Sequence, residues 1–197
     1  MLRGNEEPVR FEQGSRPTPA SPQPSNSVYK YYADGTVVIH TGGPTPAILA
    51  EYEQAINDAP EDAGLRFYYS SALRKSGRSD KALFQMREAV RIAPDWHMAH
   101  SGLAALLLSS GDSSEAIEEC GEAIRLVQSL DEPGFKGGQN MVLARWSLAS
   151  ALHQAGNIKE ARKELVQAIG LQRDLISKYN VGERLLDQLE SALVEWK

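Results

Sequence analysis

The chain has 197 residues, 42% of them hydrophobic, and its formal charge at neutral pH is −5. This length can bury a core in one or two domains, and the acidic balance argues against nucleic acid as a partner, because phosphate binding needs clustered Lys and Arg. A single cysteine, Cys120, excludes an intrachain disulfide scaffold. The first residues include Glu6 and Glu7 where a secretory signal is apolar, and the longest uncharged apolar run, residues 103–108, falls far short of the roughly 20 residues of a membrane span. We therefore expect a cytoplasmic protein that does not cross a membrane, although attachment to a membrane complex stays open.

The first segment, residues 1–27, is rich in proline and serine. Seven of the ten prolines lie within the first 46 residues, four of them at positions 17, 19, 22 and 24. A polar segment of this composition cannot build a core and is typical of extended, polyproline-like chain. We predict an extended arm over residues 1–27.

Residues 28–44 are expected to form a short β-hairpin and a linker. Asp34-Gly35 stands between two runs rich in Val, Ile and Tyr, which is a strong hairpin signal because both turn residues tolerate positive φ. A hairpin of two strands is marginally stable alone in water, so it must pack on the body of the chain, on a second copy or on a partner. The plainest interpretation is a lid over the first helix.

A repeat of 34 residues governs the rest of the chain, residues 45–197. Units 63–96 and 97–130 are in register, and unit 142–175 follows after an insertion of 11 residues. Each unit has two amphipathic stretches of helical length joined at a glycine, which predicts antiparallel helix pairs that must stack to cover their apolar faces. Equivalent positions carry the same residue types: Gly77, Gly111 and Gly156; Ala82, Ala116 and Ala161; Ala89, Ala123 and Ala168.

Flanking helices complete the predicted stack. Thr45-Pro46 has the pattern of an N-cap followed by proline at the first helical position, and it opens a half unit over residues 45–60. Asn180, with Glu183 three residues later, predicts the start of a capping helix over residues 181–196. The Gly- and Pro-rich residues 131–138 are expected to be a mobile surface loop. About eight helices result.

This pattern resembles the tetratricopeptide repeat (TPR) family, in which positions 8, 20 and 27 are small, position 15 is Gly and position 32 is Pro. The resemblance implies an all-α solenoid of helix pairs. The fourth position departs from the family pattern, because Arg66, His100 and Arg145 stand where Trp is usual. Arg162 likewise replaces an apolar residue at position 21.

No catalytic motif is present, and we expect neither enzymatic activity nor a cofactor. The chain lacks a phosphate-binding glycine loop, a His-Glu-x-x-His metal motif and a nucleophile elbow. His97, His100 and nearby Asp95 have the spacing for a metal site, but two imidazoles near a helix start are expected to face solvent, so no metal is predicted. Cys120 is expected to be a small core residue.

The resemblance places a partner-binding groove on the concave face, lined by the first helix of each unit. The chaperone adaptors of the family hold a peptide carboxylate with Lys and Asn there, and this chain lacks those residues. An apolar trough remains, suited to an amphipathic helix or an extended apolar peptide, unless another element of the chain fills it. The candidate groove residues are Phe67, Ser71, Arg74, Lys75, Met98, Ser101, Ala105, Leu108, Leu143, Trp146, Ser150 and His153.

From these features we expect a non-catalytic adaptor or accessory subunit that binds a protein partner. Within the groove, Trp146 is expected to point out of the stack and to anchor that partner. Two alternatives remain open: an assembly chaperone that shields an apolar client segment, and a regulatory protein that binds a small ligand.

Overall fold

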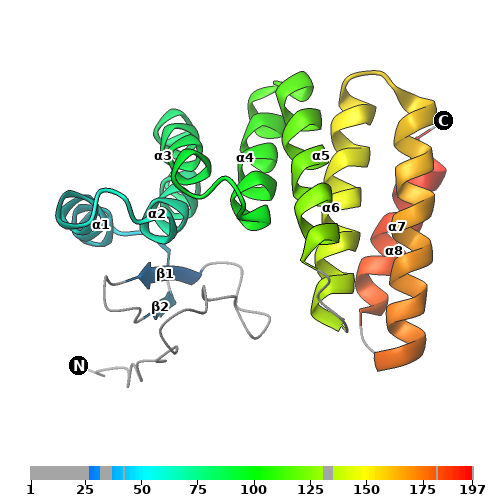
Figure 1. Ribbon diagram of the computed structural model, residues 1–197, viewed down its shortest axis with the longest axis horizontal. Helices are drawn as coiled ribbons and strands as arrows, with labels where there is room; N and C mark the ends of the chain where they lie inside the picture. Colours follow the sequence, from blue (N-terminus) through cyan, green and yellow to red (C-terminus); the bar gives the residue numbers. More distant parts are fainter. Residues whose placement is uncertain (1–26, 32–36, 42, 131–134, 181, 197) are drawn as a thin grey trace. The chain divides into compact units, whose positions relative to one another are not determined.

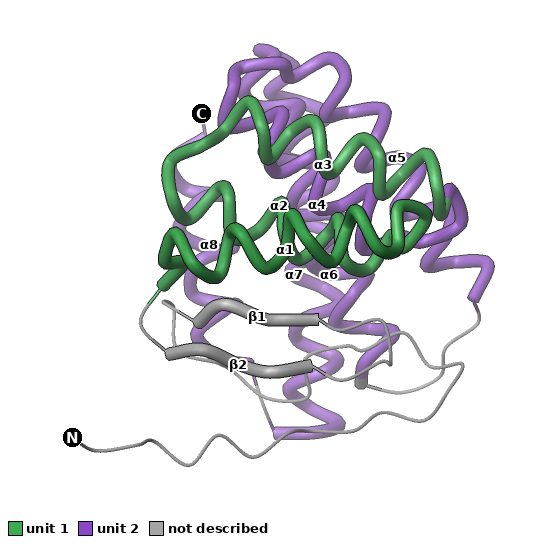
Figure 2. Tube along the Cα trace, turned by 90° about the vertical axis from the view of Figure 1, so that its left-hand side faces the viewer, with its two compact units in different colours: residues 1–93 green, residues 94–197 purple. Residues whose placement is uncertain are grey.

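The computed structural model describes residues 27–31, 37–41, 43–130, 135–180 and 182–196 (Figure 1). The predicted arm before Ser27 and the Asp34-Gly35 turn lie outside these residues. The described residues contain two short strands and eight helices, the number of helices that the sequence predicts. The chain divides into two compact units, Met1–Ala93 and Pro94–Lys197, coloured separately in Figure 2.

Two antiparallel strands begin unit 1. Strand β1 (Ser27–Tyr31) pairs with β2 (Val37–Thr41), and β1 runs beside α2 (Ala63–Lys75). Tyr31 pairs with Val37. A two-residue turn at Asp34-Gly35 would instead pair Tyr31 with Val38, so the observed register differs by one residue from the register that this turn requires.

The helices of unit 1 are α1 (Pro46–Asp58), α2 and α3 (Ser79–Ile92). The predicted start of α1 is confirmed: the Thr45 hydroxyl oxygen accepts a hydrogen bond from the Ile48 amide at 3.3 Å, and Pro46 is the first helical residue. Gly77 follows α2 with a φ of +76°, a left-handed conformation that glycine adopts without steric cost.

Small residues and stacked rings hold unit 1 together. Ala82 and Ala89 on α3 are completely buried, which lets the α3 backbone approach α2 closely. The Ser70 hydroxyl donates to the Ala82 carbonyl at 2.7 Å. On the other side of α2, the ring of Tyr69 stacks on Tyr52 of α1 with centroids 5.5 Å apart.

Unit 2 contains five helices, each packed against the next along the chain. They are α4 (His97–Ser110), α5 (Ser113–Ser129), α6 (Phe135–Gln154), α7 (Ile158–Tyr179) and α8 (Glu183–Glu195). Helix α4 also lies against α6. Ala116, Ala123, Ala161 and Ala168 are fully buried, and Cys120 is 1% exposed, so the predicted core positions are confirmed.

The structure corrects the prediction of a loop over residues 131–138. Helix α6 begins at Phe135, so residues 135–138 form its first turn, whereas residues 131–134 lie outside the described part. One glycine there, Gly138, allows close packing: a Cβ on it would stand 2.7 Å from Leu175 of α7. Composition alone could not distinguish this use of glycine from a mobile loop.

The start of the last helix also differs from the prediction. Asn180 ends α7 in a left-handed conformation, with a φ of 53°, instead of capping α8. Gly182 is the N-cap residue of α8, and its φ is +93°. The pattern around Asn180 is ambiguous, because asparagine suits both a helix start and a left-handed helix end.

Helix α8 covers the end of unit 2. Leu189 is completely buried in a core cluster with Val142, Leu165 and Ala168, and four further apolar side chains of α8 pack against this cluster: Leu185, Leu186, Ala192 and Leu193. Arg162 of α7, the departure at position 21, donates from Nη1 to the carbonyls of Leu193, at 2.6 Å, and Trp196. These carbonyls lie in the last turn of α8, which lacks partners within the helix. Over the described residues, every helix is too short or too polar to pass through a bilayer.

Candidate functional site

The predicted groove residues are divided between the two units. Phe67, Ser71, Arg74 and Lys75 lie on α2 of unit 1. The remaining eight lie on α4 and α6 of unit 2, and they are Met98, Ser101, Ala105, Leu108, Leu143, Trp146, Ser150 and His153.

Five of the predicted groove residues of unit 2 lie on the neighbouring helices α4 and α6, and we call them the α4–α6 strip: Met98, Ser101, Ala105, Leu108 and Leu143. The two helices lie side by side, and the Gln154 side-chain amide of α6 donates to the Leu108 carbonyl at 3.3 Å. Leu143 is 45% exposed and Ala105 is exposed, whereas the other three are half-buried. None of the five carries a charge, so the strip offers apolar area that costs little to desolvate.

Trp146 does not point out of the stack as predicted. It is half-buried and packs against the unit 2 core cluster that includes Val142, Ala149 and Leu189. The Ser150 hydroxyl donates to the Trp146 carbonyl at 3.0 Å, and thus stays within α6. Position in the repeat could not reveal this, because α8 contributes to the same cluster and its packing depends on tertiary structure.

His153 is likewise engaged within the chain. Its ring stacks on Trp196 with centroids 4.3 Å apart and an interplanar angle of 16°. Trp196, the C-cap residue of α8, therefore covers part of this predicted groove residue. The sequence gives no local signal for this contact, because it joins residues 43 positions apart in the chain.

The residues on α2 offer a different chemistry. Phe67 is half-buried and meets the edge of the Tyr68 ring at 5.4 Å, whereas Arg74 and Lys75 are exposed at the last turn of the helix. Partial burial, with a smaller contribution from the neighbouring Arg74, lowers the pKa of Lys75. Positive charges near the C-terminus of a helix interact favourably with the helix dipole and stabilise the helix. Arg74 and Lys75 therefore have a structural role that does not depend on a partner.

The fourth-position residues that depart from the family pattern form one recurrent contact. Each reaches an acceptor 19 residues later, on the second helix of its own unit: Arg66 to Gln85 at 2.9 Å, His100 to Glu119 at 2.6 Å and Arg145 to Glu164 at 2.5 Å. We call these three contacts the fourth-position clamps. The basic residues are evident from the repeat pattern but their partners are not, although the constant spacing of 19 residues is a signal that could identify them.

His100 is buried, contrary to the prediction that it faces solvent. It is 6% exposed, its Nδ1 contacts Glu119, and its Nε2 lies 2.9 Å from the Pro94 carbonyl oxygen. Each ring nitrogen thus lies beside an oxygen atom, an arrangement that the protonated ring satisfies best because both of its nitrogens donate. The bond to Glu119 is the largest cause that raises the pKa of His100.

His97 is buried too, at 9% exposure, and Asp95 is exposed. Over the described ranges, no group of three or more His, Cys, Asp or Glu side chains is arranged to hold a metal ion. Burial and the nearby Glu119 raise the pKa of Cys120 to about 12, so its thiol stays protonated.

Comparisons of sequence identify the repeats. Family models described as tetratricopeptide repeat match residues 49–97 and 143–175. The TPR repeat-containing thioredoxin TTL4 of Arabidopsis thaliana is 38% identical over 82 residues, which cover 42% of this chain and 12% of that protein. The matched part is therefore a small fraction of that relative, and a thioredoxin-type Cys-x-x-Cys pair cannot form from the single cysteine of this chain.

Solved structures share the fold at low sequence identity. BtubC (BKLC) from P. vanneervenii superimposes with a TM-score of 0.65 at 18% identity, over 75% of this chain and 63% of that one. The MamA protein gives 0.56 at 18% identity, over 69% and 68%, and a thermophilic TPR protein of Thermus thermophilus gives 0.55 at 17%, over 76% and 73%. With helix pairs in register and matching repeat models, residues 49–97 and 143–175 are tetratricopeptide repeats, and the solved structures share their helical fold.

Proposed function

We propose that this chain is a non-catalytic adaptor or accessory subunit that binds an amphipathic helix or an extended apolar peptide on the α4–α6 strip. TPR repeats in general are protein-interaction modules. The observation that supports this particular surface is the exposure of Leu143 beside the uncharged face of α4.

The spacing along α4 suits a helical or extended ligand. Met98, Ser101, Ala105 and Leu108 follow one another at intervals of three and four residues, so they share one face of the helix. An amphipathic helix presents its anchors at the same intervals, and small side chains at Ser101 and Ala105 leave room for larger ones from the partner.

Unit 2 is built to keep this surface rigid. Trp146 and Ala149, next to the strip on α6, are fixed against the core, and the His100–Glu119 clamp joins α4 to α5. A rigid surface loses little conformational entropy on binding, which favours affinity.

The test compares two exposed apolar residues of similar exposure. Leu143 on α6 is 45% exposed, and Val166 on α7 is 54% exposed and lies outside the strip. We would identify the bound segment from partners captured from native lysate, synthesise it as a peptide, and measure its affinity for wild-type, Leu143→Glu and Val166→Glu proteins.

Leu143→Glu should lower the affinity for the peptide at least about tenfold, which corresponds to about 1.4 kcal/mol of binding free energy. Val166→Glu should bind the peptide as tightly as the wild type does. Equal affinities for all three proteins, or equal losses in both variants, would place the binding surface elsewhere. Trp146 is unsuitable for this test, because its truncation would also disturb the core.

A further inference from the structure

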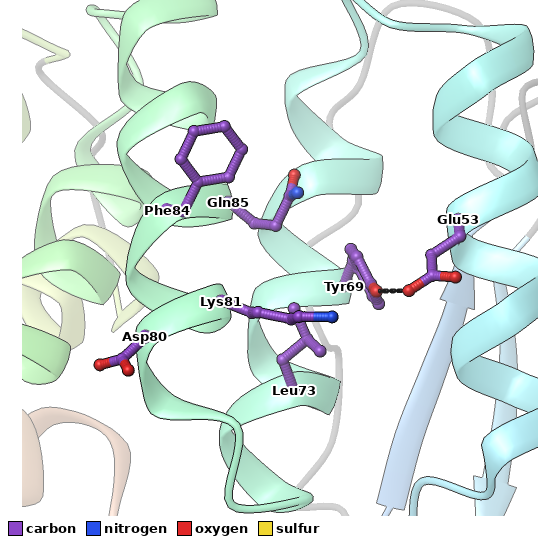
Figure 3. A pocket seen from close by; sticks show the side chains of 7 residues that line it. All are labelled: Glu53, Tyr69, Leu73, Asp80, Lys81, Phe84 and Gln85. Carbon is purple, nitrogen blue, oxygen red and sulfur yellow. Dashed lines mark hydrogen bonds between the residues drawn. The ribbon is translucent and has the colours of Figure 1, made fainter.

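Unit 1 contains a pocket of about 380 Å³ between α1, α2 and α3, well apart in the sequence from the α4–α6 strip (Figure 3). Tyr69 and Leu73 of α2 line it and are 3% and 0% exposed, whereas Phe84 of α3 is 60% exposed. The volume is within the range of sites that take a small ligand or a few residues of peptide. An exposed phenylalanine beside such a pocket is apolar area that a ligand could cover.

The polar lining of the pocket is fixed and mainly acidic. The Tyr69 hydroxyl donates to the Glu53 carboxylate of α1 at 2.6 Å, as Figure 3 shows. Burial and this contact raise the pKa of Tyr69, so the hydroxyl stays protonated and keeps Glu53 in place. Asp80 also lines the pocket, but its carboxylate points away from Glu53 in Figure 3, and Lys81 is the one cation among the lining residues.

The far wall is also anchored. Gln85 of α3 lines the pocket, and its side-chain oxygen accepts from Arg66 at 2.9 Å in the first of the fourth-position clamps. Pocket walls held by α1, α2 and α3 together need no reorganisation to receive a ligand, so the pocket is suited to a segment that binds with few contacts.

We propose that this pocket binds the proline-rich segment of the same chain, residues 16–24, with prolines against Phe84 and Arg16 toward the carboxylate of Glu53. Polyproline segments are recognised by grooves lined with aromatic rings, because their preformed helix loses little entropy on docking. Arg16 is the one charged residue between positions 14 and 26, and its sign is opposite to that of the pocket.

The attachment point allows this contact. The segment precedes Ser27, the first residue of β1, and β1 runs beside α2, the helix that carries Tyr69 and Leu73. In polyproline conformation the ten residues from Pro17 to Ser27 reach about 31 Å, longer than the about 20 Å of the 13-residue helix α2. Tethering gives an effective concentration of about 1 mM, so even a weak site would be substantially occupied.

The test uses the full chain with a spin label at Ser21→Cys. The native Cys120 stays unlabelled, because it is 1% exposed and its thiol is protonated. In a ¹⁵N-labelled sample, the label should broaden the amide signals of Lys81, Phe84 and Gln85. Phe84→Ser should abolish this broadening and Arg16→Glu should reduce it, whereas Val166→Ser, which removes an apolar residue of similar exposure from α7, should leave it unchanged.

Three results would overturn the proposal. Broadening that survives Phe84→Ser would show that the aromatic ring is not the docking surface. Broadening centred on Ala105 and Leu143 would place the segment on the α4–α6 strip instead. A third test mixes ¹⁴N chains that carry the spin label with ¹⁵N chains that carry none. Broadening of the ¹⁵N amide signals in this mixture would show that the segment reaches a second copy.

Discussion

Three buried or half-buried polar contacts replace the large aromatic residue that the family places at the fourth position. A Trp there fills space between helices, whereas Arg66, His100 and Arg145 join the two helices of a unit through hydrogen bonds. Such contacts stabilise only when both partners are present, because a lone buried charge is costly. Arg66 and His100 also bond a proline carbonyl six residues earlier, Pro60 and Pro94 respectively, which fixes the turn before each helix.

The His100 clamp predicts a dependence of stability on pH. The other charged groups that act on this ring are Glu119 and Glu122, and Glu122 is itself paired with Arg125. Because folding raises the pKa of His100, its stabilising contribution is complete below the unfolded value of about 6.5 and is lost as pH rises through the folded value. The urea midpoint should therefore fall as the pH rises above about 6.5.

His100→Arg is the matched control, because it recreates the Arg145–Glu164 pair and does not titrate in this range. This variant should lose the His100 part of the pH dependence. Identical pH profiles for the wild type and His100→Arg would show that the imidazole is not the titrating group.

Close packing at the buried alanines gives a second prediction. Ala116 is 0% exposed on α5, so Ala116→Leu should overpack the core and lower the free energy of unfolding by about 1–3 kcal/mol. Ala105→Leu adds the same atoms at an exposed position on α4 and should change the melting temperature little. Equal melting temperatures for Ala116→Leu and the wild type would contradict the assigned register of the repeat.

At the scale of elements, glycine serves two distinct purposes. Gly77, Gly111 and Gly156 take positive φ angles where one helix ends and the next begins, and nothing stands within 4 Å of their absent Cβ atoms. Gly138 and Gly182 instead lie where a Cβ would collide with Leu175 and Gln172. The second group therefore determines how closely α6 and α8 approach α7.

Gly182→Ala tests this distinction at the junction of α7 and α8. The new Cβ would collide with the Gln172 amide nitrogen and break its 3.0 Å bond to the Gly182 carbonyl, leaving a fully buried amide unsatisfied. We expect a loss of about 1–3 kcal/mol for this amide, in addition to about 1–2 kcal/mol for the left-handed backbone.

Gly111→Ala is the control, since its φ of +90° is similar but its Cβ would be in open space. Urea unfolding should show a clearly larger loss for Gly182→Ala than for Gly111→Ala. Equal losses would mean that α8 can shift to accommodate the methyl group.

At the scale of the whole molecule, the two units offer different surfaces. Unit 2 has the uncharged α4–α6 strip, whereas unit 1 has the acidic pocket with its exposed Phe84. We expect the first to take an external helix or peptide and the second to take the proline-rich segment. The two functions would then be separable by substitution.

A paired experiment checks this separation. Leu143→Glu should weaken binding of the partner peptide. The spin label at Ser21→Cys should still broaden the amide signals of Lys81 and Phe84, because the effect of Leu143→Glu is confined to unit 2. Phe84→Ser should release the segment and leave the affinity of the peptide unchanged. If a single substitution changed both the peptide affinity measured by titration and the label-induced broadening measured by NMR, the two surfaces would be coupled rather than independent.

The sequence by itself determined the helix pairs, their register and the likeness of the repeats to the tetratricopeptide pattern. These follow from local signals: Gly at the turns, Ala at the close approaches, and Thr45-Pro46 at the start of α1. Each signal acts within one turn or one repeat. It can therefore be recognised from the 34-residue period of the sequence without knowledge of the tertiary structure.

Only the tertiary structure decided which groove positions face outward. Trp146 occupies a repeat position that is expected to be exposed, yet it packs on the core cluster shared with α8, and His153 stacks on Trp196. The same holds for residues 135–138, whose glycines extend α6 because α7 needs a close approach there. These outcomes depend on which helix packs beside another, and local periodicity contains no information about contacts between residues far apart in the chain.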